Sequence, residues 1–207
     1  MIKFLYDWQT LVGAFIGGVI GLLAALLVAR DARHREERAA AMVLVADMVK
    51  VNAAYAQLEA RINEANIPDD QQAQWMVDRL LGTRPKLFAM FDSALFRIMP
   101  VHEHLAAHLT LFRAIYSDVE DRLERLREIV STYRTNGQWP IPPQNLSTHI
   151  NLIHTGFRQS VEHARCARPL LETLVLGQFP TWNRIRLKTS PTVEEKACIE
   201  LLKTGGT

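Results

Sequence analysis

An apolar segment without any charge, close to the start of the chain, constrains this protein more than any other feature. Between Asp7 and Arg30 the sequence WQTLVGAFIGGVIGLLAALLVA contains no charged side chain. As an α-helix rising about 1.5 Å per residue it would be roughly 33 Å long, enough to cross a hydrocarbon core of about 30 Å. We therefore expect a transmembrane helix over residues 10–29, preceded by a short N-terminal segment, residues 1–9.

Two other structures compete for such a segment: a cleavable secretory signal and a buried helix of a soluble protein. A signal peptide needs a basic leading region and small residues at positions −3 and −1 of its cleavage site. Here Lys3 is offset by Asp7, and a cut after Ala29 would place Leu27 at −3. Buried soluble helices rarely exceed about 18 residues without a charge. A membrane anchor therefore fits the segment better than either alternative.

The basic residues on the two flanks predict the orientation of this anchor. Lys3 is the only lysine or arginine before the segment, whereas four arginines follow it closely: Arg30, Arg33, Arg35 and Arg38. An excess of Lys and Arg stays on the cytoplasmic side of a membrane, and nearby acidic residues count for little. We expect an external N-terminus and a cytoplasmic C-terminal region.

Small residues recur at every fourth position of the segment: Gly13, Gly17, Gly21, Ala25 and Ala29. Residues four apart share one face of a helix, so the backbone of a second helix can approach this face closely. Glycine is also frequent in membrane helices for reasons other than pairing. The doubled GxxxG spacing favours a helix-pairing site made of Gly13, Gly17, Gly21 and Ala25, with a second copy or another membrane protein as the partner.

After the arginines, apolar residues recur at alternating spacings of three and four, which is typical of a helix that buries one face. The first series comprises Ala41, Leu44, Met48, Val51, Tyr55, Leu58, Ile62 and Ala65. No Gly or Pro separates this heptad seam from the apolar segment, so one helix is expected from about Thr10 to Asn66. Its residues 30–66 would form a juxtamembrane helix. Alternation typical of strands is missing, which predicts an all-α protein.

Prolines and glycines divide residues 67–207 into further helices. A second helix is expected to run to Leu81, and the apolar stretch 86–99 is expected to be a helix buried on several sides. A long helix from about Val101 to Asn136 carries a second heptad seam and ends at Gly137. This seam comprises Leu105, Leu109, Phe112, Tyr116, Val119, Leu123, Leu126, Val130 and Tyr133.

A fifth long helix, with Leu146 to Ala164 on one face, should kink or end at Pro169. An irregular stretch with Pro180 and Trp182 and a short helix over residues 192–203 complete the chain. Between the two long helices, we expect the prolines of the loop 138–143 to stiffen a turn and its tryptophan to pack beneath it, although the loop could also face a partner. Long helices with short breaks favour an antiparallel bundle, in which the seams pair within one chain or between subunits.

Histidines are the only cluster of potential metal ligands. Three of them lie on one expected helix and three on another: His102, His104, His108, His149, His154 and His163. His104 and His108 are four residues apart and could face one metal. The sequence HEHLAAH differs from HExxH, and the Glu-x-x-His pairs of di-iron bundles are missing. We therefore expect structural histidines, no catalytic residue and no cofactor, with His104 and His108 as the remaining metal candidates.

Several other functions and chemistries are disfavoured by the sequence. Phosphate-binding loops, dinucleotide fingerprints and nucleophile elbows are missing, and a net charge of +2 without a basic stripe argues against a nucleic-acid partner. Cys166 and Cys198 are far apart in the sequence and outside any CxxC pair. We expect a buried free thiol at Cys166 and a reducing compartment, although flanking arginines could make this thiol reactive.

The residues DWQTLVGA, from Asp7 to Ala14, resemble the start of small, uncharacterised proteobacterial membrane proteins. In those proteins a tryptophan-led anchor runs into an arginine-rich helix. The resemblance covers residues 1–40 and implies a single-pass protein of a bacterial inner membrane, without implying an active site.

These features together predict a membrane-anchored helical interaction or scaffold protein that self-associates through the span and the heptad seams. Its expected partners are the lipid bilayer and a second copy or another membrane protein. The alternative, from a different functional class, is a membrane-tethered metal- or ligand-binding sensor or enzyme that uses the helix-borne histidines.

Overall fold

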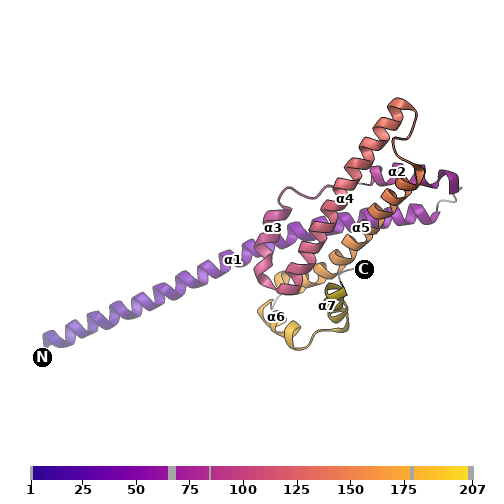
Figure 1. Ribbon diagram of the computed structural model, residues 1–207. Coiled ribbons are helices and arrows are strands. Elements are labelled where there is room, and N and C mark those ends of the chain that lie inside the picture. The colour runs from indigo at the N-terminus through magenta and orange to yellow at the C-terminus, as the bar shows by residue number, and fades with distance from the viewer. Residues whose placement is uncertain (1, 65–68, 84, 178–179, 205–207) are drawn as a thin grey trace.

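The computed structural model describes residues 2–64, 69–83, 85–177 and 180–204 (Figure 1). Within these ranges all regular secondary structure is helical, and no strand occurs. The all-α class predicted from the spacing of apolar residues is therefore confirmed.

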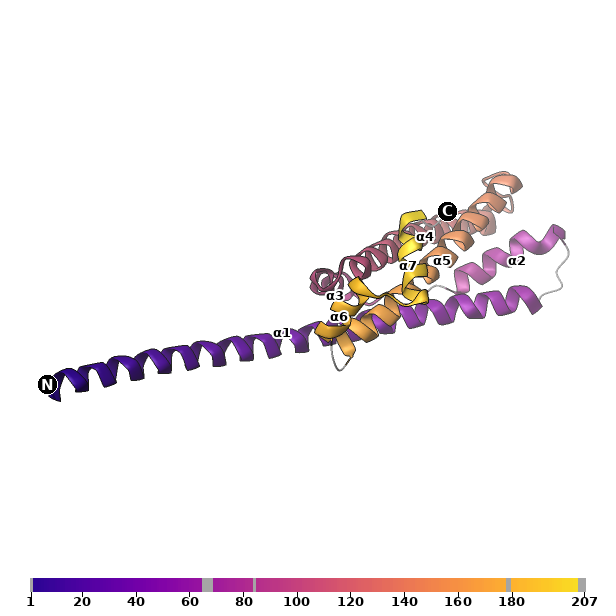
Figure 2. The same cartoon turned by 90° about the horizontal axis from the view of Figure 1, so that it is seen from below.

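Helix α1 (Ile2–Glu64) is one continuous helix of 63 residues, roughly 95 Å long at the standard rise. It confirms the expected fusion of the apolar segment with the first heptad seam. The apolar half projects away from the rest of the molecule, and the other half packs against it (Figures 1 and 2). Among the described residues α1 is the one helix long and apolar enough to cross a membrane, with a mean hydropathy of 2.6 in its most apolar window.

The first heptad seam is followed by α2 (Asp69–Gly82), α3 (Phe91–Ile98) and the 3₁₀ turn η1 (Met99–Val101). The helix predicted over residues 86–99 is wrong for its first five residues, which form no helix. Their backbone is bound by α1 instead: Phe88 N–H donates to the buried Asp47 carboxylate at 2.9 Å. Lys50 donates to the Lys86 carbonyl at 3.0 Å. These hydrogen bonds bind the non-helical segment to α1.

The expectation that this stretch would be buried on several sides is also wrong. One face of α3 is buried, through Phe91, Ala94, Leu95 and Ile98. The large apolar side chains on the other side of the stretch are exposed: Phe88, Met90, Phe96 and Met99. A wide apolar face on a helix therefore does not prove burial on all sides.

The two longest helices of the domain, α4 (Glu103–Asn136) and α5 (Pro143–Leu171), run side by side in opposite directions (Figures 1 and 2). Gly137 ends α4 with φ +72°, a left-handed conformation that suits glycine, and its N–H donates to the Tyr133 carbonyl at 2.7 Å. Trp139 then stacks on Tyr133 with ring centroids 4.2 Å apart, as expected for a tucked tryptophan. Gly156 permits close helix contact, because a methyl there would lie 2.8 Å from the Val119 side chain.

The C-terminal part contains the π-helical turn η2 (Glu172–Leu176), α6 (Pro180–Thr189) and α7 (Val193–Thr204). The stretch with Pro180 and Trp182 was expected to be irregular, and this is wrong, because it forms α6. Proline at the first helical position has its φ already suited to a helix. Helix α7 begins with a capping box, in which Thr192 and Glu195 each accept the backbone N–H of the other.

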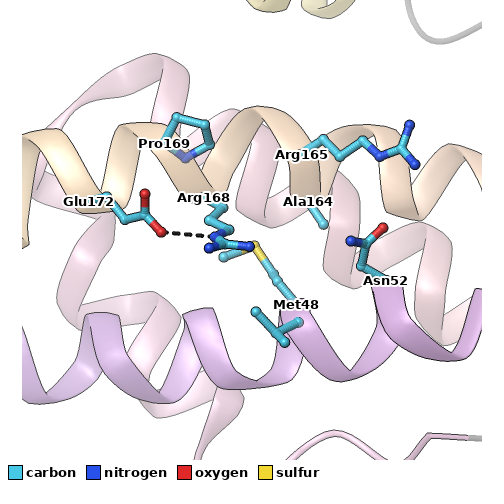
Figure 3. A pocket seen from close by; sticks show the side chains of 8 residues that line it. Met48, Asn52, Ala164, Arg165, Arg168, Pro169 and Glu172 are labelled. Atoms are coloured by element: carbon cyan, nitrogen blue, oxygen red, sulfur yellow. Dashed lines mark hydrogen bonds and ion pairs between the residues drawn. The ribbon is translucent and has the colours of Figure 1, made fainter. Parts of the chain in front are cut away.

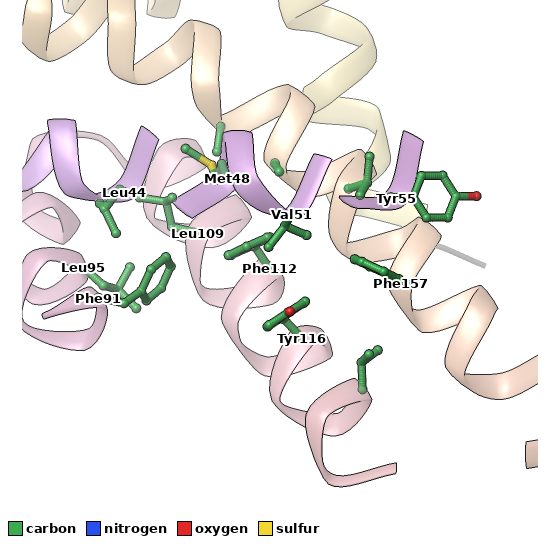
Figure 4. Packing of buried hydrophobic residues seen from close by; sticks show 14 of the residues in the cluster. Leu44, Met48, Val51, Tyr55, Phe91, Leu95, Leu109, Phe112, Tyr116 and Phe157 are labelled. Carbon is green, nitrogen blue, oxygen red and sulfur yellow. The ribbon is translucent and has the colours of Figure 1, made fainter. Parts of the chain in front are cut away.

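Both heptad seams contribute to one core within a single chain. Leu44, Met48 and Val51 of α1 belong to the same buried cluster as Phe112 and Tyr116 of α4 (Figure 4). Most members of the two seams are buried, whereas Ile62 is half-buried and Ala65 and Asn66 lie outside the described residues. Burying a large apolar side chain contributes about 1.5–3 kcal/mol.

Candidate functional site

The predicted helix-pairing residues lie on the half of α1 that projects from the domain. All described residues from Leu11 to Arg30 are exposed. A Cβ atom added at Gly13, Gly17 or Gly21 would meet no atom within 4 Å. Ala25 continues the same face. The structure therefore presents these four residues together as an open surface of small side chains, flanked by exposed Leu, Ile and Phe.

A buried carboxylate fixes this projecting half to the domain. Glu37 of α1 is 4% exposed. Its carboxylate lies 3.0 Å from Arg33 Nε, 3.6 Å from His34 Nδ1 and 3.5 Å from Arg184 Nη2 of α6. Arg184 also donates to the Leu174 carbonyl at 3.3 Å. A buried charge requires such partners, so this junction binds α6 to α1 close to the point where α1 leaves the domain.

In the sequence Glu37 is one of several acidic residues that follow the span, and none of them was expected to have a role. The spacing of Arg33 and Glu37, one helical turn apart, was a signal for their ion pair. The partner from α6 was not visible in the sequence, since Arg184 is 147 residues away. A second link between α1 and the domain is exposed: Arg97 of α3 donates to Glu36 at 2.5 Å.

The metal candidates His104 and His108 do not form a shared site. The His108 ring is buried and faces His163 of α5, with their Nδ1 atoms 3.0 Å apart. Burial and the adjacent His163 lower the pKa of His108 to about 4. The His104 backbone N–H instead donates to His102 Nδ1, which caps the start of α4. In the described ranges no group of three or more His, Cys, Asp or Glu is placed to hold a metal ion.

A further histidine links two helices. His154 of α5 lies 2.6 Å from Glu59 of α1 and beside the Tyr55 ring. Burial and this glutamate raise the pKa of Tyr55 to about 12. The alternative of a histidine-based metal sensor therefore has no ligand set in the part of the chain that the structure describes.

The two cysteines form a disulfide between α5 and α7, which corrects the expected free thiol at Cys166. Cys166 and Cys198 are bonded, with Cα atoms 5.5 Å apart. The expectation was wrong because it was based on a separation of 32 residues along the chain, whereas helix packing decides the distance in space. The bond also removes the cysteines as an argument for a reducing compartment.

A shallow cavity of about 290 Å³ lies between α1 and α5 (Figure 3). Arg168 and Glu172 on its wall form an ion pair at 2.8 Å, so each neutralises the other. Asn52 on the opposite wall has a buried side-chain oxygen without a hydrogen-bond donor. Met48 and Pro169 make up part of the remaining wall, and no acid, base and nucleophile come together among these residues. The cavity therefore suggests no catalytic chemistry.

No family model, curated protein or solved structure matches this chain. Similarity therefore assigns no activity, ligand or partner to these residues. Two features stand out on physical grounds: the open apolar face of α1, and the charged junction at Glu37 that joins α1 to α6 just after this face.

Proposed function

We propose that this protein is a single-pass membrane protein in which α1 anchors a helical interaction or scaffold domain. One observation carries the proposal: the apolar half of α1 is fully exposed, yet it continues without a break into a well-packed core. Soluble monomers rarely expose a continuous apolar surface of this length. A bilayer accepts a helix, because all its backbone polar groups are paired within it.

The domain would be an antiparallel bundle whose helices pack through coiled-coil-like seams. The polar faces of these helices would then face partners. Its two heptad seams are buried in the core of one chain, so they are not free to join subunits. Self-association would therefore use the span, where Gly13, Gly17, Gly21 and Ala25 allow close backbone contact.

The resemblance of residues 1–40 and the arginines after the span support a bacterial inner membrane with the domain in the cytoplasm. The disulfide favours the opposite side, because such bonds persist in oxidising compartments. We give the arginines precedence, since flanking Lys and Arg set the orientation during insertion. In the cytoplasm, this disulfide would be mostly reduced.

Native mass spectrometry of the full-length protein, extracted gently from its membrane, tests the self-association. We expect a homo-oligomer that dissociates in Gly17→Ile, because an isoleucine would separate the helix backbones. Gly18→Ile is the matched control: its position is equally open but lies about 100° around the helix. A monomeric wild type, or equal behaviour of the two variants, would contradict pairing through this face.

The anchor and the orientation are tested separately. A protein that fractionates as soluble would contradict the anchor. A C-terminal tag that is protected from protease in sealed spheroplasts, whose outer membrane has been removed, supports a cytoplasmic domain, whereas a cleaved tag would reverse the orientation and agree with the disulfide.

A further inference from the structure

The end of the helical domain from which the span emerges carries exposed apolar side chains on three elements, α3, η1 and α6. Phe96 of α3 is 71% exposed, and Trp182 and Ile185 of α6 are 69% and 53% exposed. Met99 in η1 lies one helical turn after Phe96 and is exposed as well. Figures 1 and 2 both show α3 and α6 at this end. Single exposed apolar residues are common, but a group of large ones at one end marks an interaction surface.

Residues of α1 that lie beside α3 show where α3 is located relative to the end of the span. Phe96, Arg97 and Pro100 line a shallow cavity together with Ala29 and Arg33. Ala29 is the last residue of the uncharged segment. When this segment fills the hydrocarbon core, Phe96 therefore lies at the level of the headgroups.

Helix α6 binds α1 at a point slightly farther from the span. Arg184 reaches the Glu37 carboxylate at 3.5 Å, two helical turns after the end of the uncharged segment. Ile185 and Lys188 line another cavity with Pro100 and Val101, which places α6 beside η1. Trp182 lies two residues before Arg184. Tryptophan is enriched at membrane interfaces, since its ring is apolar and its N–H can remain hydrated.

The charges around this end suit a lipid surface. Its basic residues outnumber its acidic ones, although Arg33, Arg35, Arg97 and Arg184 each pair with a carboxylate. The basic residues are Arg30, Arg33, Arg35, Arg38, Arg97, Arg184 and Lys188, and the acidic ones are Asp31, Glu36, Glu37 and Glu103. Exposed apolar side chains can insert between lipid headgroups, and the basic residues around them attract anionic lipids.

We propose that Phe96, Met99, Trp182 and Ile185 form a membrane-contact surface that lies against the headgroup layer of the bilayer crossed by α1. The inference rests on the proposed membrane anchor. The partner is a lipid surface, because the ion pairs of Arg97 with Glu36 and of Arg184 with Glu37 bind α3 and α6 to the part of α1 that directly follows the span. Contact at this surface would fix the tilt of the domain relative to the membrane.

Tryptophan quenching in lipid vesicles tests this surface. The full-length chain contains four tryptophans, and replacing Trp8, Trp75 and Trp139 by Phe leaves Trp182 as the reporter. The protein is reconstituted in vesicles of phosphatidylcholine and phosphatidylglycerol whose acyl chains carry bromine close to the headgroup. We expect the emission of Trp182 to shift to shorter wavelength and to lose most of its intensity relative to vesicles without bromine.

Two further chains each carry one new tryptophan, and in both of them all four native tryptophans are replaced by Phe. Phe96→Trp reports on α3 and should be quenched like Trp182. Leu152→Trp is the matched control, an exposed apolar position on α5 outside the proposed surface, and should keep its emission. Circular dichroism establishes that each chain is folded.

A chain that keeps only Trp8 separates the failure of this inference from the failure of the anchor. Quenching of Trp8 without quenching at positions 96 and 182 would overturn the membrane-contact surface and leave the anchor intact. A blue shift at position 182 without quenching would also overturn it, and would indicate contact with a second copy. No quenching of Trp8 would overturn the anchor and this inference with it.

Discussion

His108 of α4 and His163 of α5 face each other in the core with their Nδ1 atoms 3.0 Å apart, and both rings are almost fully buried. At this distance one neutral ring donates its proton to the other. A proton added to the acceptor would leave two N–H groups facing each other. Burial lowers the pKa of both histidines, and for His108 the value is about 4.

This histidine pair predicts a loss of stability in mild acid. The pKa of His108 is about 4 in the folded protein and about 6.5 in the unfolded chain, so unfolding takes up a proton between these values. The free energy of unfolding should therefore fall by up to about 3 kcal/mol as the pH drops from about 6.5 to about 4. Thermal unfolding in detergent at several pH values, followed by circular dichroism, measures this.

The matched variants for this experiment are His108→Gln and His149→Gln. The first removes the titrating ring, and its stability should depend less on pH than that of the wild type. His149 is half-buried on α5 and should leave the wild-type profile unchanged when replaced. If the profile of His108→Gln coincides with that of the wild type, the pair does not control the acid response.

Two neighbouring glutamates allow a direct test of the junction between the span and the domain. Glu37→Gln removes a buried negative charge that forms ion pairs with Arg33 and Arg184. It should lower the free energy of unfolding by about 1–3 kcal/mol. Glu36→Gln removes an exposed partner of Arg97 and should cost less than about 1 kcal/mol. Hydrogen exchange should be faster in α6 of Glu37→Gln. Equal effects of the two substitutions would rule out a special role for the buried carboxylate.

The disulfide should stabilise the packing of α7. Closing a loop of 32 residues restricts the unfolded chain and is worth about 3–4 kcal/mol in the loop-entropy model. The double substitution Cys166→Ser and Cys198→Ser should lower the unfolding temperature and speed hydrogen exchange in α7. The Cys198 backbone also lies against His108, so the pKa of His108 should change when α7 loosens, as an NMR titration would show.

A dithiol reductant provides the control for this third prediction. It should destabilise the wild type and leave the double variant unchanged. A wild-type protein that is oxidised beforehand, with the disulfide verified by mass, and is then equally stable with and without reductant would show that the disulfide contributes little to α7.

The second heptad seam predicts a strong effect of charge at Leu123, which is 3% exposed. Leu123→Asp places a carboxylate in the apolar contact between α4 and α5 and should cost several kcal/mol. Leu152→Asp makes the same change at an exposed position of α5 and should have little effect. Urea unfolding of the two variants compares them. Tolerance of Leu123→Asp would mean that α4 packs on nothing at this point.

Local patterns in the sequence were sufficient to predict most helices. The 3-4 spacing of the two seams identified buried faces, since residues at these spacings share one side of a helix. Gly137 predicted the end of α4, because its left-handed conformation disfavours other residues. Predictions failed where a distant side chain competes for the backbone, as Asp47 does for Phe88. They also failed at Pro180, which suggested irregular structure although it is the first residue of α6.

Some features of the candidate sites could likewise be predicted from the sequence, and others could not. The sequence alone determined the apolar span, the row of small residues from Gly13 to Ala25 and the arginines after them, because these depend only on helical periodicity and composition. Only the tertiary structure decided that His108 meets His163, that Cys166 meets Cys198 and that Glu37 meets Arg184. Such pairs depend on the crossing and register of helices far apart in the chain. No local pattern encodes these distances.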